Sequence, residues 1–209
     1  MKNVIGLHVI LGGLERVRLL ELARIAEEEG AAVVQLREKT LPTGEIIKIA
    51  DSLRNVLHRT TFIINDRADI ALAVGANGVH LGQDDLPIEA ARELLGADMI
   101  IGASTSNVEE ALAAERRGAN YLGFGHMFPT RSKEKQTPPR TVSELSAVTA
   151  AVSLPVIAIG GITSTNVREI AVSVLGGVAV ISAISQAKNP RMVVSEFVKI
   201  LEKQNVAIS

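Results

Sequence analysis

The sequence predicts an α/β fold, a single-domain (β/α)8 barrel of the TIM type that spans residues 1–209. Short β-branched runs alternate with helical stretches along the whole chain. Apolar residues make up 47% of the chain but aromatic residues only 2%, so Val, Ile, Leu and Ala must build the core, as in parallel sheets. A length of 209 residues suits one such domain and is short for two.

Eight β-branched runs are candidate strands, and helical patterns lie between them. In the first helical stretch, Leu19, Leu22, Ala23 and Ala26 have the i, i+3, i+4, i+7 spacing of one buried helix face. The predicted strands span residues 4–11, 32–38, 60–66, 78–83, 99–105, 121–125, 155–161 and 177–184. Eight strands alternating with eight helices favour a closed parallel sheet.

The connections support the same fold. Gly30, Gly75 and Gly118 each end a helical stretch just before a strand, where glycine suits a left-handed C-cap. An open doubly wound sheet is the structural alternative. It would more often have a Gly-rich fingerprint after its first strand, where this chain reads Leu11-Gly12-Gly13-Leu14.

Composition excludes several classes of function. With 22 basic and 23 acidic residues and few aromatics, the chain lacks the basic, aromatic-lined groove of a nucleic-acid binder. The absence of cysteine excludes disulfides, thiolate catalysis and zinc–thiolate sites. Neither a signal peptide nor an apolar run long enough for a membrane span is evident, so we expect a cytoplasmic protein.

Polar and glycine residues gather where the predicted strands end, the face that carries the active site in barrels of this type. In chain order they are Gln35, Arg37, Lys39, Asn65, Asp66, His80, Asp85, Ser104, His126, Thr130, Ser132, Lys133, Gly160, Gly161 and Ser182, and the apolar Ile181 lies next to Ser182.

These groups indicate a polyanionic ligand and a divalent cation. Arg37, Lys39 and Lys133 supply positive charge. Asp66 and Asp85 supply hard oxygen ligands for Mg²⁺, which commonly uses one or two carboxylates together with substrate phosphates. The Gly160-Gly161 pair after the seventh strand would let backbone N–H groups approach a phosphate.

Each of these residues also has a purely structural interpretation. Arg37 and Lys39 flank Glu38 and could form surface ion pairs. Asp66 and Asp85 could cap the helices that follow them. His80, taken alone, is more typical of a satisfied core histidine than of a catalyst. The joint placement of these residues at strand ends favours a site.

One connection breaks the pattern of short loops. Residues 126–140, after the sixth strand, form a 15-residue stretch with four positive charges and three prolines. Connections of this length are usually functional or disordered. Its position puts it on the face expected to hold the active site.

Several motifs together resemble the thiamine-phosphate synthase family. They are Asn65-Asp66-Arg67-Ala68-Asp69, the runs at residues 78–87, 155–162 and 178–184, and Phe128-Pro129-Thr130 with Ser132-Lys133. The resemblance covers nearly the whole chain, and the family fold is a (β/α)8 barrel. It implies an enzyme that joins a pyrimidine pyrophosphate to thiazole phosphate, giving thiamine phosphate and pyrophosphate.

The resemblance also implies roles for individual residues. His126, Lys133, Arg37, Lys39 and His80 are the catalytic candidates, and Asp66 and Asp85 would hold Mg²⁺. The pyrimidine pyrophosphate would contact Gln35, Arg37, Lys39, Asn65, Ser104 and Lys133. The thiazole phosphate would contact Thr130, Ser132, Gly160, Gly161, Ile181 and Ser182.

Two departures from the synthase pattern leave alternatives open. Gly125-His126 stands where synthases usually have Gly-Pro, and the first strand, which contains His8, lacks the tyrosine and the following Thr-Asp that synthases usually have. Both histidines resemble the related thiazole tautomerase (TenI-type) branch, in which His126 would be the general acid/base without any metal. A further alternative is a non-catalytic regulator that binds thiazole or thiamine phosphate. A homodimer is a possible assembly.

Overall fold

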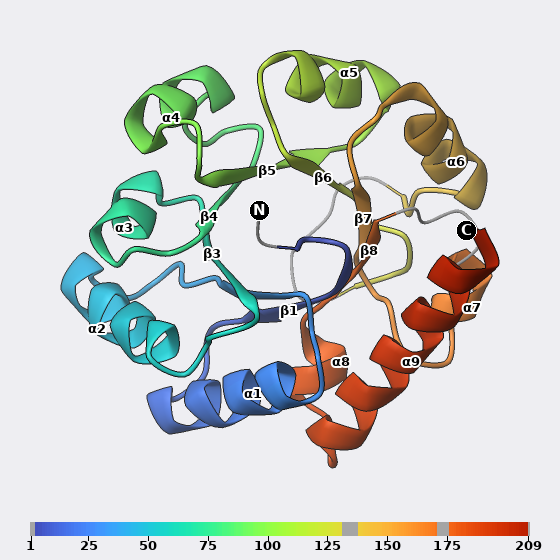
Figure 1. Ribbon diagram of the computed structural model, residues 1–209. Coiled ribbons are helices and arrows are strands. Elements are labelled where there is room, and N and C mark those ends of the chain that lie inside the picture. Colours follow the sequence, from blue (N-terminus) through green and yellow to red (C-terminus); the bar gives the residue numbers. More distant parts are fainter. Residues whose placement is uncertain (1–2, 131–137, 171–175, 209) are drawn as a thin grey trace.

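Eight parallel strands close into one barrel in the computed structural model, which describes residues 3–130, 138–170 and 176–208 (Figure 1). Each strand pairs with the next in the chain, and β8 returns to β1. The predicted fold class is therefore confirmed, and the open sheet is excluded. The strands are β1 (Gly6–Leu11), β2 (Val33–Leu36), β3 (Thr61–Asn65), β4 (Gly78–Leu81), β5 (Ile100–Thr105), β6 (Tyr121–Gly125), β7 (Val156–Ile159) and β8 (Gly177–Val180).

Helices surround this ring of strands (Figure 1). In the described residues they are α1 (Arg16–Glu28), α2 (Thr43–Arg54), α3 (Ala68–Ala73), α4 (Ile88–Leu95), α5 (Val108–Arg116), α6 (Val142–Ala151), α7 (Val167–Ile170), α8 (Ser182–Ser185) and α9 (Pro190–Ile208). No helix in these ranges is both long and apolar enough to cross a membrane.

The predicted end of the eighth strand was wrong. We expected it to reach residue 184, but β8 ends at Val180 and the short helix α8 follows, so the described chain has one helix more than predicted. The apolar alternation continues past Val180, which explains the error. The last paired residues of β8 are Ala179, opposite Ile159, and Val180, opposite Val9. Beyond them the chain turns into a helix.

Side-chain alternation along the strands creates two separate cores. Residues that face outward, such as Leu7, Val9 and Leu11 of β1, pack against the helices in the larger cluster. Residues that face inward form a smaller cluster inside the barrel, which contains Ile10, Val33, Ile63, Ile100, Tyr121, Ile157 and Ala179. Toward the carboxyl ends of β2 to β5, the inward positions carry the polar side chains Gln35, Asn65, His80 and Ser104.

Barrel closure depends on glycine at the seam between β1 and β8. Gly6 pairs with Gly177, with φ angles of 132° and 138°, and the Gly6 N–H donates to the Gly176 carbonyl at 2.7 Å. A Cβ atom on Gly177 would lie 1.9 Å from the Gly6 carbonyl oxygen. Any other residue at Gly177 would force the two strands apart.

A buried carboxylate ties α1 to the N-terminal end of β3. Glu27, 9% exposed, accepts hydrogen bonds from the backbone N–H groups of His58, Arg59 and Thr60 at 2.9–3.2 Å. Burial alone would raise the pKa of Glu27, but these hydrogen bonds outweigh burial and lower it from 4.5 to about 2. Glu27 thus takes the place of water as the hydrogen-bond acceptor for three backbone N–H groups of a turn, which strand and helix pairing leave without a partner.

We predict that Glu27→Gln lowers the free energy of unfolding at pH 7 by about 1–3 kcal/mol, because charged hydrogen bonds are lost. A depressed folded-state pKa gives stability that is present above pH 4.5 and lost as the pH falls toward 2. Urea unfolding at several pH values should therefore show the difference between wild type and variant shrinking in acid. The control is Glu28→Gln, which removes an exposed ion pair with Arg191. This variant should change the free energy of unfolding little. A loss independent of pH would contradict this role.

Candidate active site

A pocket of about 470 Å³ opens at the carboxyl ends of the strands. Its walls are the polar inward positions of the barrel and the loops that follow the strands. Twelve predicted residues line it: Gln35, Arg37, Lys39, Asn65, Asp66, His80, Asp85, Ser104, His126, Thr130, Gly160 and Ile181. Gly161 and Ser182 do not line this pocket, and Ser132 and Lys133 lie outside the described residues.

The pocket has one charged corner, where β2, β3 and β4 end. The Lys39 ammonium forms an ion pair and hydrogen bond with the Asp66 carboxylate, which comes from the neighbouring strand end. Asp66 adopts φ 62°, a left-handed conformation rare outside glycine, and its N–H donates to the His80 carbonyl at 2.8 Å. This backbone geometry holds the Asp66 carboxylate against the pocket.

Asp66 and Asp85 do not serve as the helix caps considered above. The N-cap of α3 is Arg67 and that of α4 is Pro87, and neither cap makes a side-chain hydrogen bond. The Asp85 carboxylate instead accepts the N–H of Gly82 at 2.7 Å, within the loop that follows β4. Both carboxylates are therefore directed by their own loops toward the same corner of the pocket.

The two carboxylates face each other. Burial raises the pKa of Asp66, and the adjacent Asp85 carboxylate raises it further, against the opposing effect of Lys39. Each carboxylate disfavours ionisation of the other because both would be negative at short distance. Two such carboxylates are a typical arrangement for binding a cation. The electrostatics of this corner thus fit a bound divalent ion, since such an ion would relieve the repulsion.

A neutral hydrogen-bonded chain crosses the floor of the pocket. His80 Nδ1 lies 2.9 Å from the Tyr121 hydroxyl, and His80 Nε2 lies 3.0 Å from Ser104 Oγ. Burial lowers the pKa of His80 to about 4. His8 packs edge-on to the Tyr121 ring at 5.3 Å, and burial lowers its pKa to about 4 as well. Both imidazoles are therefore neutral near pH 7.

The opposite wall comes from β6 and β7. His126, 6% exposed, follows β6, and the loop from Met127 to Pro129 runs beside the end of β7. A Cβ on Gly160 would lie 2.3 Å from His126 Cβ, and one on Gly161 would lie 2.5 Å from the Pro129 carbonyl. The need for two glycines here is thus explained by the packing of this loop.

Two pocket residues escaped the sequence analysis. Tyr121 was not selected, and His8 was noted without a role, although both line the pocket. Neither belongs to a polar run at a strand end, which was the signal that identified the others. Tyr121 is the only tyrosine of the chain, and its inward position opposite Gly102 follows from strand pairing, which the sequence does not show.

Comparison with known proteins identifies the family. Residues 7–184 match the family model described as thiamine monophosphate synthase. The chain is 47% identical to a thiamine-phosphate synthase of Chlorobium limicola over 184 residues, covering 87% of this chain and 88% of the relative. It is 41% identical to that of Pyrococcus furiosus over 207 residues, covering 97% and 98%.

Solved structures agree with the sequence comparison. Thiamine phosphate pyrophosphorylase from Pyrococcus furiosus superposes with a TM-score of 0.86 at 40% identity, over 97% of this chain and 98% of that one. A 3-hexulose-6-phosphate synthase, with a TM-score of 0.75 at 17% identity over 94% and 100% of the chains, shares the fold alone. This chain belongs to the thiamine monophosphate synthase family.

Proposed function

We propose that this protein joins 4-amino-2-methyl-5-hydroxymethylpyrimidine pyrophosphate to thiazole phosphate, releasing pyrophosphate and forming thiamine phosphate. The names of its relatives, which match most of the chain, support the synthase over the tautomerase and the regulator. The structural observation that carries the proposal is the charged corner, where two basic side chains and two facing carboxylates meet. A pyrophosphate substrate bound together with Mg²⁺ would use all four.

The Asp66–Asp85 pair is the proposed Mg²⁺ site. No group of three or more His, Cys, Asp or Glu in the described residues could hold a metal by itself. Mg²⁺ does not require one, because it commonly binds one or two carboxylates and completes its shell with water and substrate phosphates. When bound, the ion would neutralise charge on the pyrophosphate leaving group.

The basic side chains bind the pyrophosphate beside that site. Lys39 reaches the corner from the loop after β2, and Arg37 lines the same pocket two residues earlier. An arginine can hold phosphate oxygens in a bidentate contact, and a lysine acts as a point charge. In the free protein the Lys39 ammonium pairs with the Asp66 carboxylate. When the pyrophosphate binds, it would therefore share the positive charge of Lys39 with Asp66.

The coupling reaction requires no covalent bond between the protein and either substrate. Loss of pyrophosphate from the pyrimidine methylene leaves a resonance-stabilised cation, which the thiazole nitrogen captures. The protein must therefore stabilise the departing charge, orient both reactants and exclude water, and it needs no general base. Gln35 and Asn65, inward residues of β2 and β3, line the pocket and would hold the pyrimidine half.

The thiazole phosphate would bind on the opposite wall. Thr130, Gly160 and Ile181 line the pocket there, from the loops after β6, β7 and β8. Gly161 and Ser182 lie next to two of these residues in the chain, although they do not line the pocket itself. The two substrates would thus enter from opposite sides and meet above the His80–Tyr121 floor.

One observation keeps the tautomerase as a second candidate. His126 is buried and lines the same pocket, within reach of a thiazole on the β6–β7 wall. An imidazole there could move the proton that makes the ring aromatic. A cytoplasmic location and a homodimer stay predictions of the sequence analysis.

Paired turnover assays test the proposal. With pyrimidine pyrophosphate, thiazole phosphate and Mg²⁺, the protein should form thiamine phosphate, and EDTA should stop the reaction. Asp66→Asn should lower the rate on the order of 100-fold, because it removes a carboxylate that would hold the Mg²⁺ neutralising the leaving group. The control is Asp69→Asn, at an exposed ion pair with Arg67, which should keep wild-type activity.

The second assay offers only the non-aromatic thiazole carboxylate phosphate. Metal-independent aromatisation that His126→Ala abolishes, with no thiamine phosphate in the first assay, would replace the synthase by the tautomerase. Tight binding of thiazole phosphate or thiamine phosphate, with no turnover in either assay, would support the regulator.

A stability measurement tests the carboxylate pair without turnover. The raised pKa of Asp66 means that ionising it costs folding free energy, a cost that grows as the pH rises above 3.8. Asp85→Asn should therefore raise the melting temperature in metal-free buffer.

Added Mg²⁺ should then raise the melting temperature of the wild type but not of Asp85→Asn. The matched control is Asp98→Asn, an exposed carboxylate before β5 at the other end of the barrel, which should keep the response of the wild type. Equal responses of wild type and Asp85→Asn to Mg²⁺ would refute the proposed metal site.

A further inference from the structure

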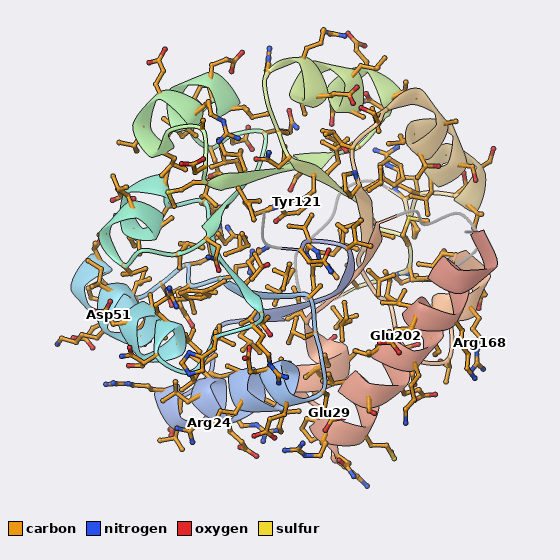
Figure 2. All side chains as sticks on the ribbon, in the orientation of Figure 1. Arg24, Glu29, Asp51, Tyr121, Arg168 and Glu202 are labelled. Atoms are coloured by element: carbon orange, nitrogen blue, oxygen red, sulfur yellow. The ribbon has the colours of Figure 1, made fainter. Side chains whose placement is uncertain are left out.

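Tyr121 lies inside the ring of strands, beneath the pocket, where Figure 2 labels it near the barrel axis. Its side chain is 1% exposed. Its ring sits against Gly102 of the neighbouring strand, where a Cβ atom would come within 2.1 Å of the tyrosine Cζ. His8 packs against the ring from β1. These contacts fix the orientation of the ring and with it the direction of the hydroxyl.

The Tyr121 hydroxyl points toward His80, and Ser104 lies on the other side of the His80 ring. The Tyr121 hydroxyl lies 2.9 Å from His80 Nδ1, and His80 Nε2 lies 3.0 Å from Ser104 Oγ. Gly123 leaves room for the imidazole, since a Cβ there would lie 3.1 Å from His80 Cε1. Three side chains from β4, β5 and β6 thus form one chain of hydrogen bonds from the barrel interior to the pocket.

This chain has a preferred direction. In the part of the molecule that the structure describes, both His80 nitrogens hydrogen-bond to hydroxyls rather than to carboxylates, so the imidazole carries one proton. A phenol is more acidic than a serine hydroxyl and its oxygen is a weaker acceptor. The Tyr121 hydroxyl therefore donates to Nδ1, and the single imidazole proton remains on Nε2, where it is donated to Ser104 Oγ.

We propose that Tyr121 is a positioning residue that fixes the Nε2–H tautomer of His80 and thereby makes Ser104 a hydrogen-bond donor to the substrate. Because Ser104 Oγ accepts from His80, its own proton is free for the pocket. The group it recognises must be an acceptor, a ring nitrogen or a phosphate oxygen of the pyrimidine pyrophosphate, and not the exocyclic amine. This inference rests on the proposed function for the identity of that substrate.

Nitrogen-15 NMR of the free protein tests the tautomer. The chain has four histidines, and loss of one set of ring signals in His80→Gln assigns those of His80. At pH 7 we expect an unprotonated Nδ1 and a protonated Nε2. In Tyr121→Phe, which keeps the ring but loses the hydroxyl, the signals should move toward a mixture of tautomers. A protonated Nδ1 in the wild type, or unchanged signals in Tyr121→Phe, would overturn the proposal.

Kinetics of the same variants test the consequence for the substrate. Tyr121→Phe should raise the KM for pyrimidine pyrophosphate about tenfold, the equivalent of about 1.4 kcal/mol, and leave the KM for thiazole phosphate unchanged. In His80→Gln, the amide can donate to Ser104 without help from Tyr121. Adding Tyr121→Phe to His80→Gln should then cause no further rise in the KM for pyrimidine pyrophosphate. If the hydroxyl had a purely structural role, the double variant would instead show a further rise.

A control separates this effect from general loss of a buried hydroxyl. The Thr61 hydroxyl, at the N-terminal end of the barrel, donates to the Asn3 carbonyl at 2.7 Å and is also buried. Thr61→Val should leave the His80 signals and both KM values unchanged. If the wild type forms no thiamine phosphate, the proposed function fails, whereas the NMR result still decides the tautomer. An equal rise in both KM values in Tyr121→Phe would show a packing defect instead and would sink the positioning role.

Discussion

Closure of the sheet is the constraint on which the rest of this structure depends. The seam between β1 and β8 closes through the close approach of Gly6 and Gly177, and no larger residue fits at Gly177. Once the ring is closed, alternation along each strand leaves one set of side chains facing the helices and another facing the axis. Residues far apart in sequence are then forced to meet near that axis at the carboxyl ends of the strands.

The closed barrel has to pack its interior and still leave room for a ligand. In the lower layer Ile10, Val33, Ile63 and Ile157 fill the space, and Tyr121 occupies the centre. Toward the carboxyl ends of β2 to β5 the inward positions are polar, and the buried polar side chains of the barrel find hydrogen-bond partners within the protein. His80 bonds to Tyr121 and Ser104, and His8 bonds to the Val4 carbonyl at 2.7 Å. Charge is confined to the solvent-facing rim, where Lys39 and Asp66 pair.

The sequence was enough to predict the closed barrel and most residues of its pocket, because both follow from local patterns. Their places at or near the carboxyl ends of predicted strands put Gln35, Asn65, His80 and Ser104 on one face of the barrel from the sequence alone. Strand ends were less predictable. The apolar alternation after Val180 continues into α8, and pairing with neighbouring strands, which decides where a strand stops, is not local.

Contacts across the barrel were also beyond the sequence. Nothing in the spacing of Asp66 and Asp85 reveals that their carboxylates face each other, since that depends on the left-handed turn at Asp66. Tyr121 stood at the start of an apolar run and gave no polar signal. The Gly160-Gly161 pair was assigned to a phosphate, and the structure adds a packing reason for it, the loop after β6.

A crystal structure of the protein soaked with Mg²⁺ and pyrophosphate tests the central claim most directly. The account predicts pyrophosphate beside Arg37 and Lys39, with a magnesium ion bridging it to Asp66 and Asp85. A second cavity of about 500 Å³ lies at the opposite end of the barrel, lined by Glu27, Glu28 and Arg59 among others. Pyrophosphate bound there, or a metal bound away from both aspartates, would contradict the assignment of the active site.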